Sequence, residues 1–147
     1  MPNLKIDGFN EVEDILQTLA KDGVGLIKSA LYPASHITYE EVQRQIDGFN
    51  NMDDIDRRGL KTSLYHSKMF EENGVIYEVI GFTGYNERGA PNIEIARSLE
   101  HGHSTKNNSM FIKKRPFMRP ALNHTKSQVI HKMQDEITEK VKKLQKG

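Results

Sequence analysis

Two histidines separated by a single residue are the strongest metal-binding candidates in this chain. His101 and His103 flank a glycine, and Glu100 places a carboxylate beside them. A protein zinc site needs three or four side-chain ligands, and no further histidine or carboxylate follows at a recognisable spacing. We therefore interpret both histidines as side chains of an exposed loop and predict no metal site.

The remaining histidine and carboxylate pairs also lack a catalytic pattern. His124 and His131 lie seven residues apart on the expected last helix, so they share a similar face, where contact with solvent or a partner is the ordinary role. The acid pairs Asp53–Asp54 and Glu71–Glu72 occur in turn-like sequence. Carboxylates in such segments are usually solvated.

Sequence motifs of nucleophilic, metal-assisted and phosphate chemistry are missing. The chain contains no HExxH, no GxSxG and no GxxxxGK followed by Ser or Thr. Gly81–Gly84 (GFTG) is too short for a phosphate cradle. The absence of cysteine excludes thiol nucleophiles, thiolate metal ligands and disulfides. We predict a protein that is not an enzyme and that uses no cofactor.

The most unusual segment is Lys113–Pro120 (KKRPFMRP). It holds four cations, two prolines and Phe117 within eight residues. Electrostatics alone favours a phosphate-binding patch. Alternatively, the prolines stiffen a connector whose Phe117 enters the core and positions the element that follows. Composition does not decide between these two interpretations.

Length and composition indicate one soluble domain spanning residues 1–147. The chain has 36% hydrophobic and 28% charged residues, and its mean hydropathy of −0.66 predicts long segments facing solvent or a partner. Met1–Phe9 lacks the basic start and apolar run of a signal peptide. No apolar stretch approaches the ~20 residues that span a bilayer. We expect a protein made in the cytoplasm, without membrane contact.

Charge is divided unequally along the chain, although the total is only +1. Residues 1–100 hold 10 Lys and Arg against 17 Asp and Glu, a net of −7, whereas residues 101–147 hold 11 against 3, a net of +8. Such segregation suits nucleic-acid contact, or pairing with an acidic face of another copy. A solvated basic helix is the simpler alternative.

Hydrophobic spacing predicts helices in the first half of the chain. One helix begins at Asn10, which with Glu13 forms a capping-box pattern. We expect a break at Gly23 and Gly25, and an end at Tyr32, because the residue before a proline avoids the helical conformation. A second helix should start near Thr38, followed by an acidic loop over 50–56.

The second half of the chain reads as a β-hairpin followed by helices. Residues 64–69 and Val75–Phe82 flank an Asn-Gly turn signature at 73–74. A loop over 83–92, a short helix over 93–99, a polar loop over 101–108 and a short strand over 110–112 should follow. An apolar stripe with flanking lysines predicts a last helix over about Asn123–Gln145, capped by Asn123 or Thr125.

Three sequence elements, in this order, resemble the tail-completion or neck proteins of long-tailed bacteriophages. They are Gly59–Ser63 (GLKTS) before the hairpin, Ser98–His103 (SLEHGH), and Arg115–Leu122 (RPFMRPAL) before a charged amphipathic helix. The likeness covers about residues 59–147, and RPFMRPAL is specific for so short a string. Many members carry Phe-Gly-Thr where this chain has His-Gly-His at 101–103, and a shorter, more basic N-terminal helix.

The resemblance implies an α+β fold with helices packed on a small, mostly antiparallel β-sheet and a long C-terminal amphipathic helix. It also implies a homo-oligomeric ring, a hexamer, at the head–tail neck of the virion. Partners would be head-closure or connector proteins and the tail terminator or tail tube, with genomic DNA passing through the lumen. The implied subunit and partner interface comprises Glu100, Gly102, Arg115, Pro116, Phe117, Arg119 and Pro120, with Arg115 and Arg119 pairing with acids of a neighbour.

Two rival functions are left open by the residues. One is a small DNA-binding protein that uses the basic C-terminal segment, although a pI near 8.0 is low for a dedicated DNA binder. The other is a metal-dependent hydrolase built on the histidines.

Overall fold

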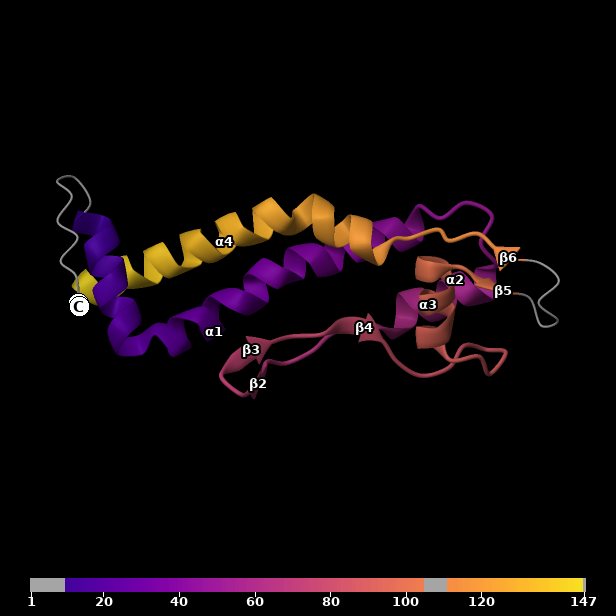
Figure 1. Cartoon of the computed structure of the whole chain (residues 1–147), viewed down its shortest axis with the longest axis horizontal. Coiled ribbons are helices and arrows are strands. Elements are labelled where there is room, and N and C mark those ends of the chain that lie inside the picture. Colours follow the sequence, from indigo (N-terminus) through magenta and orange to yellow (C-terminus); the bar gives the residue numbers. More distant parts are fainter. Residues whose placement is uncertain (1–9, 105–110, 147) are drawn as a thin grey trace.

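Two long helices run side by side along the length of the protein, and the shorter elements gather towards one end (Figure 1). A computed structural model describes the backbone of residues 10–104 and 111–146, and the side chains of 23–104 and 111–143. In chain order the elements are α1 (Asn10–Asp47), α2 (Asp54–Ser63), β1 (Leu64–His66), β2 (Phe70–Glu72), β3 (Val75–Tyr77), β4 (Ile80–Phe82), α3 (Asn92–His101), β5 (His103–Ser104), β6 (Phe111–Ile112) and α4 (Met118–Lys146).

Residues 10–47 form one continuous helix, α1, so the predicted division into two helices is wrong. Pro33 lies inside α1, where it removes one backbone hydrogen bond. Ala30 and Ala34, on either side of it, are fully buried, and tertiary packing of this kind overrides local helix breakers. The ribbon of α1 bends in its indigo N-terminal part (Figure 1).

Thr38 joins α1 to α4 and is not a helix cap, which corrects another expectation. Its hydroxyl lies 2.8 Å from that of Thr125 on α4, and both residues are buried. Thr125 Oγ1 donates to the carbonyl of Ala121 at 2.7 Å. Since a hydroxyl has a single proton, Thr38 must be the donor to Thr125. This buried pair fixes the register of the two long helices.

The predicted β-hairpin is confirmed in two antiparallel pairs. β1 pairs with β4, aligning Leu64 with Phe82, and β2 pairs with β3, aligning Glu72 with Val75. The turn residues Asn73 and Gly74 have φ of 52° and 78°. Positive φ at both positions is what a tight two-residue hairpin turn requires.

The α+β fold class and the long C-terminal helix are also confirmed, with local corrections. The strands form three separate two-stranded antiparallel sheets. Part of the expected acidic loop over 50–56 belongs to α2, whose first backbone N–H groups are capped by Asp53. Gly59–Ser63 lies within the same helix. The expected short helix is present as α3. The end of the predicted loop over 101–108 and the first residue of the predicted strand, Met110, lie outside the described residues.

The described hydrophobic core lies where the short elements meet α1 and α4. Phe117, which directly precedes α4, is fully buried and meets the ring of Phe49 edge-on at 5.4 Å. Around it pack buried apolar side chains from six elements, namely Val42, Ile46, Leu60, Leu64, Phe82, Ala96 and Ala121. The connector interpretation of Phe117 is therefore correct, because this ring anchors the start of α4 in the core.

Candidate functional site

Two of the three sequence elements of the resemblance, Ser98–His103 and Arg115–Leu122, meet in space at the end of α3 and the beginning of α4. We call Glu100, Gly102, Arg115, Pro116 and Phe117 the α3–α4 junction. Besides the side-chain contacts described below, the backbone N–H of Arg115 donates to the carbonyl of Leu99 at 2.7 Å. The family resemblance implies that these residues belong to one interface, but it does not predict that they contact one another within a single chain.

Glu100 caps α4 from a distance of 17 residues along the chain. Its Oε1 accepts the backbone N–H groups of Phe117 and Met118, both at 2.8 Å, and its Oε2 accepts that of Arg119 at 3.1 Å. These donors have no partner within the helix, and the positive end of the helix dipole favours a carboxylate there. α4 therefore begins at Met118, earlier than the predicted Asn123, and Pro120 is tolerated because a first-turn residue needs no N–H.

The ionisation of Glu100 reflects this capping role. Burial raises the pKa of its carboxyl group, whereas the three backbone N–H donors lower it. The donors prevail, so the pKa of Glu100 lies below its ordinary value of 4.5. Hydrogen bonds to the charged form are the physical cause of such a shift. The carboxylate is thus charged at neutral pH and committed to the backbone of α4.

Gly102 ends α3 in a conformation that a side chain would not tolerate. Its φ is 76°, and a Cβ at this position would lie 2.7 Å from the carbonyl oxygen of Ile112 and 2.8 Å from the ring of Phe111. The close approach accompanies the pairing of β5 with β6. Glycine at this position allows the chain after α3 to lie against the chain that enters α4.

The burial of the junction corrects the predicted interface. Phe117 offers no surface to a partner, and Glu100 is occupied by the backbone of α4, so both residues can affect a partner only indirectly. Arg115, Pro116 and Arg119 are exposed, and Pro120 is half-buried. These four residues keep their place in the predicted interface.

Arg115 forms one wall of an open pocket of about 480 Å³. Its guanidinium donates to the carbonyl of Asn50 at 3.1 Å and lies 5.6 Å from the centre of the Phe49 ring. Across the described residues, no carboxylate forms an ion pair with Arg115 or Arg119. The pocket is lined by Arg44, Gln45, Gly48, Phe49, Asn50 and Arg115.

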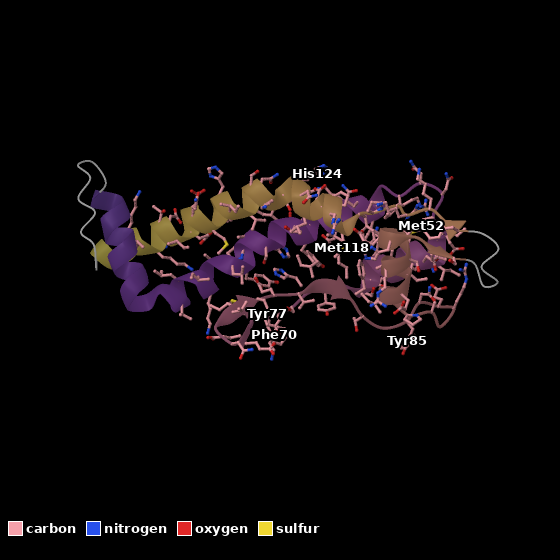
Figure 2. All side chains as sticks on the ribbon, in the orientation of Figure 1. Met52, Phe70, Tyr77, Tyr85, Met118 and His124 are labelled. Carbon is pink, nitrogen blue, oxygen red and sulfur yellow. The ribbon has the colours of Figure 1, made fainter. Side chains whose placement is uncertain are left out.

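The sequence-predicted histidine pairs do not converge. His101 ends α3 and His103 lies in β5, and both side chains are exposed. His124 and His131 are exposed on α4, the former labelled in Figure 2. In the described ranges, no group of three or more His, Asp or Glu side chains is placed to hold a metal ion.

A different histidine pair lies between α1 and the hairpin, and the sequence did not predict it. We define the imidazole cluster as Ser35 and His36 of α1, His66 of β1, and Glu78, which follows β3. The side chains of His66 and Glu78 are 2% and 3% exposed. His66 Nδ1 lies 3.1 Å from His36 Nδ1, and His66 Nε2 lies 2.9 Å from Ser35 Oγ.

Aromatic rings of α1 stack on this cluster. Tyr32 lies on His66 with a centroid distance of 4.0 Å and an interplanar angle of 5°, and Tyr39 lies 6.0 Å from His66. The signal in the sequence was the spacing of Tyr32, His36 and Tyr39, which places three rings on one helix face. Pro33 hides this signal, because a proline predicts the end of a helix and so separates Tyr32 from the other two rings.

Proton counting fixes the hydrogen bonds of the imidazole cluster. Ser35 Oγ has two acceptors in reach, the Tyr32 carbonyl at 3.3 Å and Glu78 Oε1 at 2.8 Å, and the nearer carboxylate takes its proton. His66 Nε2 then donates to Ser35 Oγ. Neutral His66 therefore has a bare Nδ1, which accepts the Nδ1–H of His36.

This arrangement does not have the geometry of a Ser-His-acid catalytic triad. In a triad, the nucleophile and the acid contact opposite nitrogens of the imidazole ring. Here Ser35 Oγ and Glu78 Oε2 both lie near His66 Nε2, at 2.9 and 3.1 Å, while Nδ1 faces another histidine. Ser35 directs its proton to Glu78, so His66 is not placed to activate it.

Comparisons with known proteins give no support from relatives. No protein-family model matches the chain, and no curated protein and no solved structure matches it significantly. The likeness to phage neck proteins thus rests on the sequence elements alone. None of the helices in the described part of the chain has the length and hydropathy needed to cross a membrane.

Proposed function

We propose that this protein is a structural component of the head–tail neck of a long-tailed bacteriophage and has no catalytic residue. It forms a ring, a hexamer by family resemblance, between the head-closure proteins and the tail terminator or tail tube. The observation that supports this most is the α3–α4 junction. Two of the three elements of the resemblance, Ser98–His103 and Arg115–Leu122, meet there, and each supplies residues that hold the other in place.

The junction presents cations at fixed positions on the surface. Phe117 and the Glu100 cap hold the start of α4, so the exposed Arg115 and Arg119 on either side of Phe117 are held with it. Their guanidinium groups have no ion-pair partner within the described part of the chain. Fixed cations of this kind suit carboxylates on a neighbouring subunit, and repetition of one heterologous contact closes a ring.

Charge reversal tests this contact. Replacing Arg115 and Arg119 together by Glu should abolish the joining of heads to tails in an assembly assay. The matched control replaces Lys142 and Lys143, exposed cations near the other end of α4, by Glu, which changes the net charge equally. The proposed contact is wrong if the Arg115→Glu, Arg119→Glu protein still joins heads to tails.

A DNA-binding function is the second candidate, because the same region exposes several cations. These are Lys113, Lys114, Arg115, Arg119 and Lys126. Binding to duplex DNA through phosphates would weaken steeply as salt is raised. Tight, salt-dependent binding by the free protein would favour this function, whereas DNA that passes through a ring lumen needs only weak, sequence-independent contact.

A further inference from the structure

The imidazole cluster attaches the hairpin to α1 through buried side chains, in addition to the hydrophobic core, where Leu64 and Phe82 hold the base of the hairpin. Figure 1 shows the hairpin extending back alongside α1, and Figure 2 places Phe70 and Tyr77 at its far end. An exposed ion pair, Lys28–Glu71, adds a second tie at 3.0 Å. A two-stranded hairpin is marginally stable by itself in water, so its attachment to α1 decides where it lies.

We propose that the contact between His36 and His66 is an acid-sensitive latch, which holds the hairpin on α1 at neutral pH and releases it when both imidazole rings become protonated. The inference concerns the position of the hairpin and is independent of the proposed neck function.

The latch follows from the number of protons that the Nδ1···Nδ1 contact can hold. At 3.1 Å, one nitrogen must carry a proton and the other must be bare. The neutral pair satisfies this requirement. A first added proton is also accommodated, because His36 can bind it at Nε2, which lies 3.6 Å from Glu40. A second added proton places N–H groups on both facing nitrogens, and the contact becomes a repulsion between two cations.

The groups around His66 determine the sign of the pH effect. Burial lowers the pKa of His66, Glu78 opposes this shift, and His36 reinforces it, with a net pKa below 6.5. Tyr32 and Tyr39 of α1 cover the ring and bring no charge at neutral pH. A base with a lowered pKa in the closed state stabilises that state fully above its ordinary pKa of 6.5. That stabilisation is lost as the pH falls from 6.5 towards the lowered pKa.

The size of the effect follows from the same linkage. Each unit by which closure lowers the pKa of His66 raises the open-to-closed ratio by up to about tenfold at acidic pH. The second added proton governs opening, because it places N–H groups on both facing Nδ1 atoms.

Spin labels can report opening directly, because the chain has no native cysteine. Cysteines at Val75, exposed on β3, and at Lys126, exposed on α4, would carry the labels. Double electron–electron resonance should give one narrow distance distribution at about pH 7.5 and a second, broader population at about pH 5. The His36→Gln variant should open less than the wild-type protein at about pH 5, since a protonated His66 can donate to the glutamine oxygen while burial still lowers the pKa of His66. His131→Gln, an exposed histidine of α4, should behave as wild type.

Several outcomes would overturn the latch. The first is a wild-type distance distribution that does not change with pH. The second is a narrower wild-type distribution at acidic pH, which would mean that the His66–Glu78 ion pair dominates. The third is equal opening of the His36→Gln variant and the wild-type protein. Loss of helicity at about pH 5 would do the same, because the latch predicts local opening only. If the His36→Gln variant is already open at neutral pH, the wild-type protein is tested instead, by following the NMR chemical shifts of its imidazole carbons as the pH is changed. The proposal then requires His66 to titrate below 6.5.

Discussion

Glu100 Oε1 accepts the backbone N–H of Phe117 at 2.8 Å, which ties the last turn of α3 to the residue that anchors α4. A capping carboxylate is usually supplied by the residue at the start of its own helix. Here it comes from another helix, so the cap also sets how the two helices meet. The exposed cations proposed to contact a neighbour are held by this same bond, which makes the junction the place to test first.

Replacing Glu100 by Gln should lower the free energy of unfolding by about 0.5–2 kcal/mol, the range for loss of a helix cap. The amide keeps an acceptor oxygen but loses the charge and one acceptor. Urea denaturation monitored by circular dichroism measures the change. Glu94→Gln, at an exposed ion pair of the same helix, should cost about 0–1 kcal/mol.

The same carboxylate should make stability depend on pH. Because the pKa of Glu100 is lowered from 4.5 in the folded protein, its contribution is fully present above 4.5 and is lost as the pH falls through the lowered folded value. The difference in stability between the wild-type protein and Glu100→Gln should therefore shrink below about pH 4.5. A constant difference down to about pH 3 would show that the charge does not matter.

Phe117→Ala should destabilise the fold by about 3–5 kcal/mol, because it removes a fully buried ring and leaves a cavity. Phe111→Ala provides the matched control, since Phe111 is 67% exposed and should change stability by only about 0.5 kcal/mol. Thermal or urea unfolding distinguishes them. Similar losses for the two variants would mean that Phe117 is not part of the core.

Gly102→Ala should be more destabilising than Gly89→Ala, although both glycines have positive φ, 76° and 80°. A Cβ at Gly89 meets nothing within 4 Å, whereas one at Gly102 would meet the Ile112 carbonyl at 2.7 Å. The Gly89 variant measures the cost of positive φ without a steric contact, about 1–2 kcal/mol, and the excess at Gly102 measures the close approach together with the extended ψ of 170° at that residue. Equal losses would contradict the tight contact between the end of α3 and β6.

The buried hydroxyl pair between the long helices predicts strong non-additivity. Thr38→Val should cost little because it removes a donor, whereas Thr125→Val should cost about 1–3 kcal/mol by leaving the Thr38 proton buried without an acceptor. The double variant should recover much of that loss, because both polar groups are gone. A double-mutant cycle with additive losses would disprove the assigned donor and acceptor.

Local signals in the sequence predicted the elements whose causes are local. The Asn73–Gly74 turn fixed the hairpin because both residues accept positive φ, and the apolar stripe of α4 identified a long helix. The failures have non-local causes. α1 continues through Pro33 because packing outweighs one lost hydrogen bond, and α4 begins at Met118 because its cap lies on α3.

The candidate sites divide in the same way. Sequence elements selected Glu100, Gly102 and Arg115, but could not show that they form one junction, since the contacts cross 17 residues of chain. His36 and His66 are 30 residues apart, and this spacing does not predict that their side chains are in contact. Only the face shared by Tyr32, His36 and Tyr39 pointed to that location.

The mass of the purified protein in solution, measured by light scattering, tests the central claim most directly. It should be measured for the protein alone and mixed with the head-closure and tail-tube proteins encoded beside it. The neck assignment predicts a ring-sized complex, near six times the 16.8 kDa chain if the ring is a hexamer, either alone or on mixing. A 16.8 kDa monomer that binds neither partner would contradict the neck assignment. Tight binding of duplex DNA by that monomer would favour the DNA-binding function.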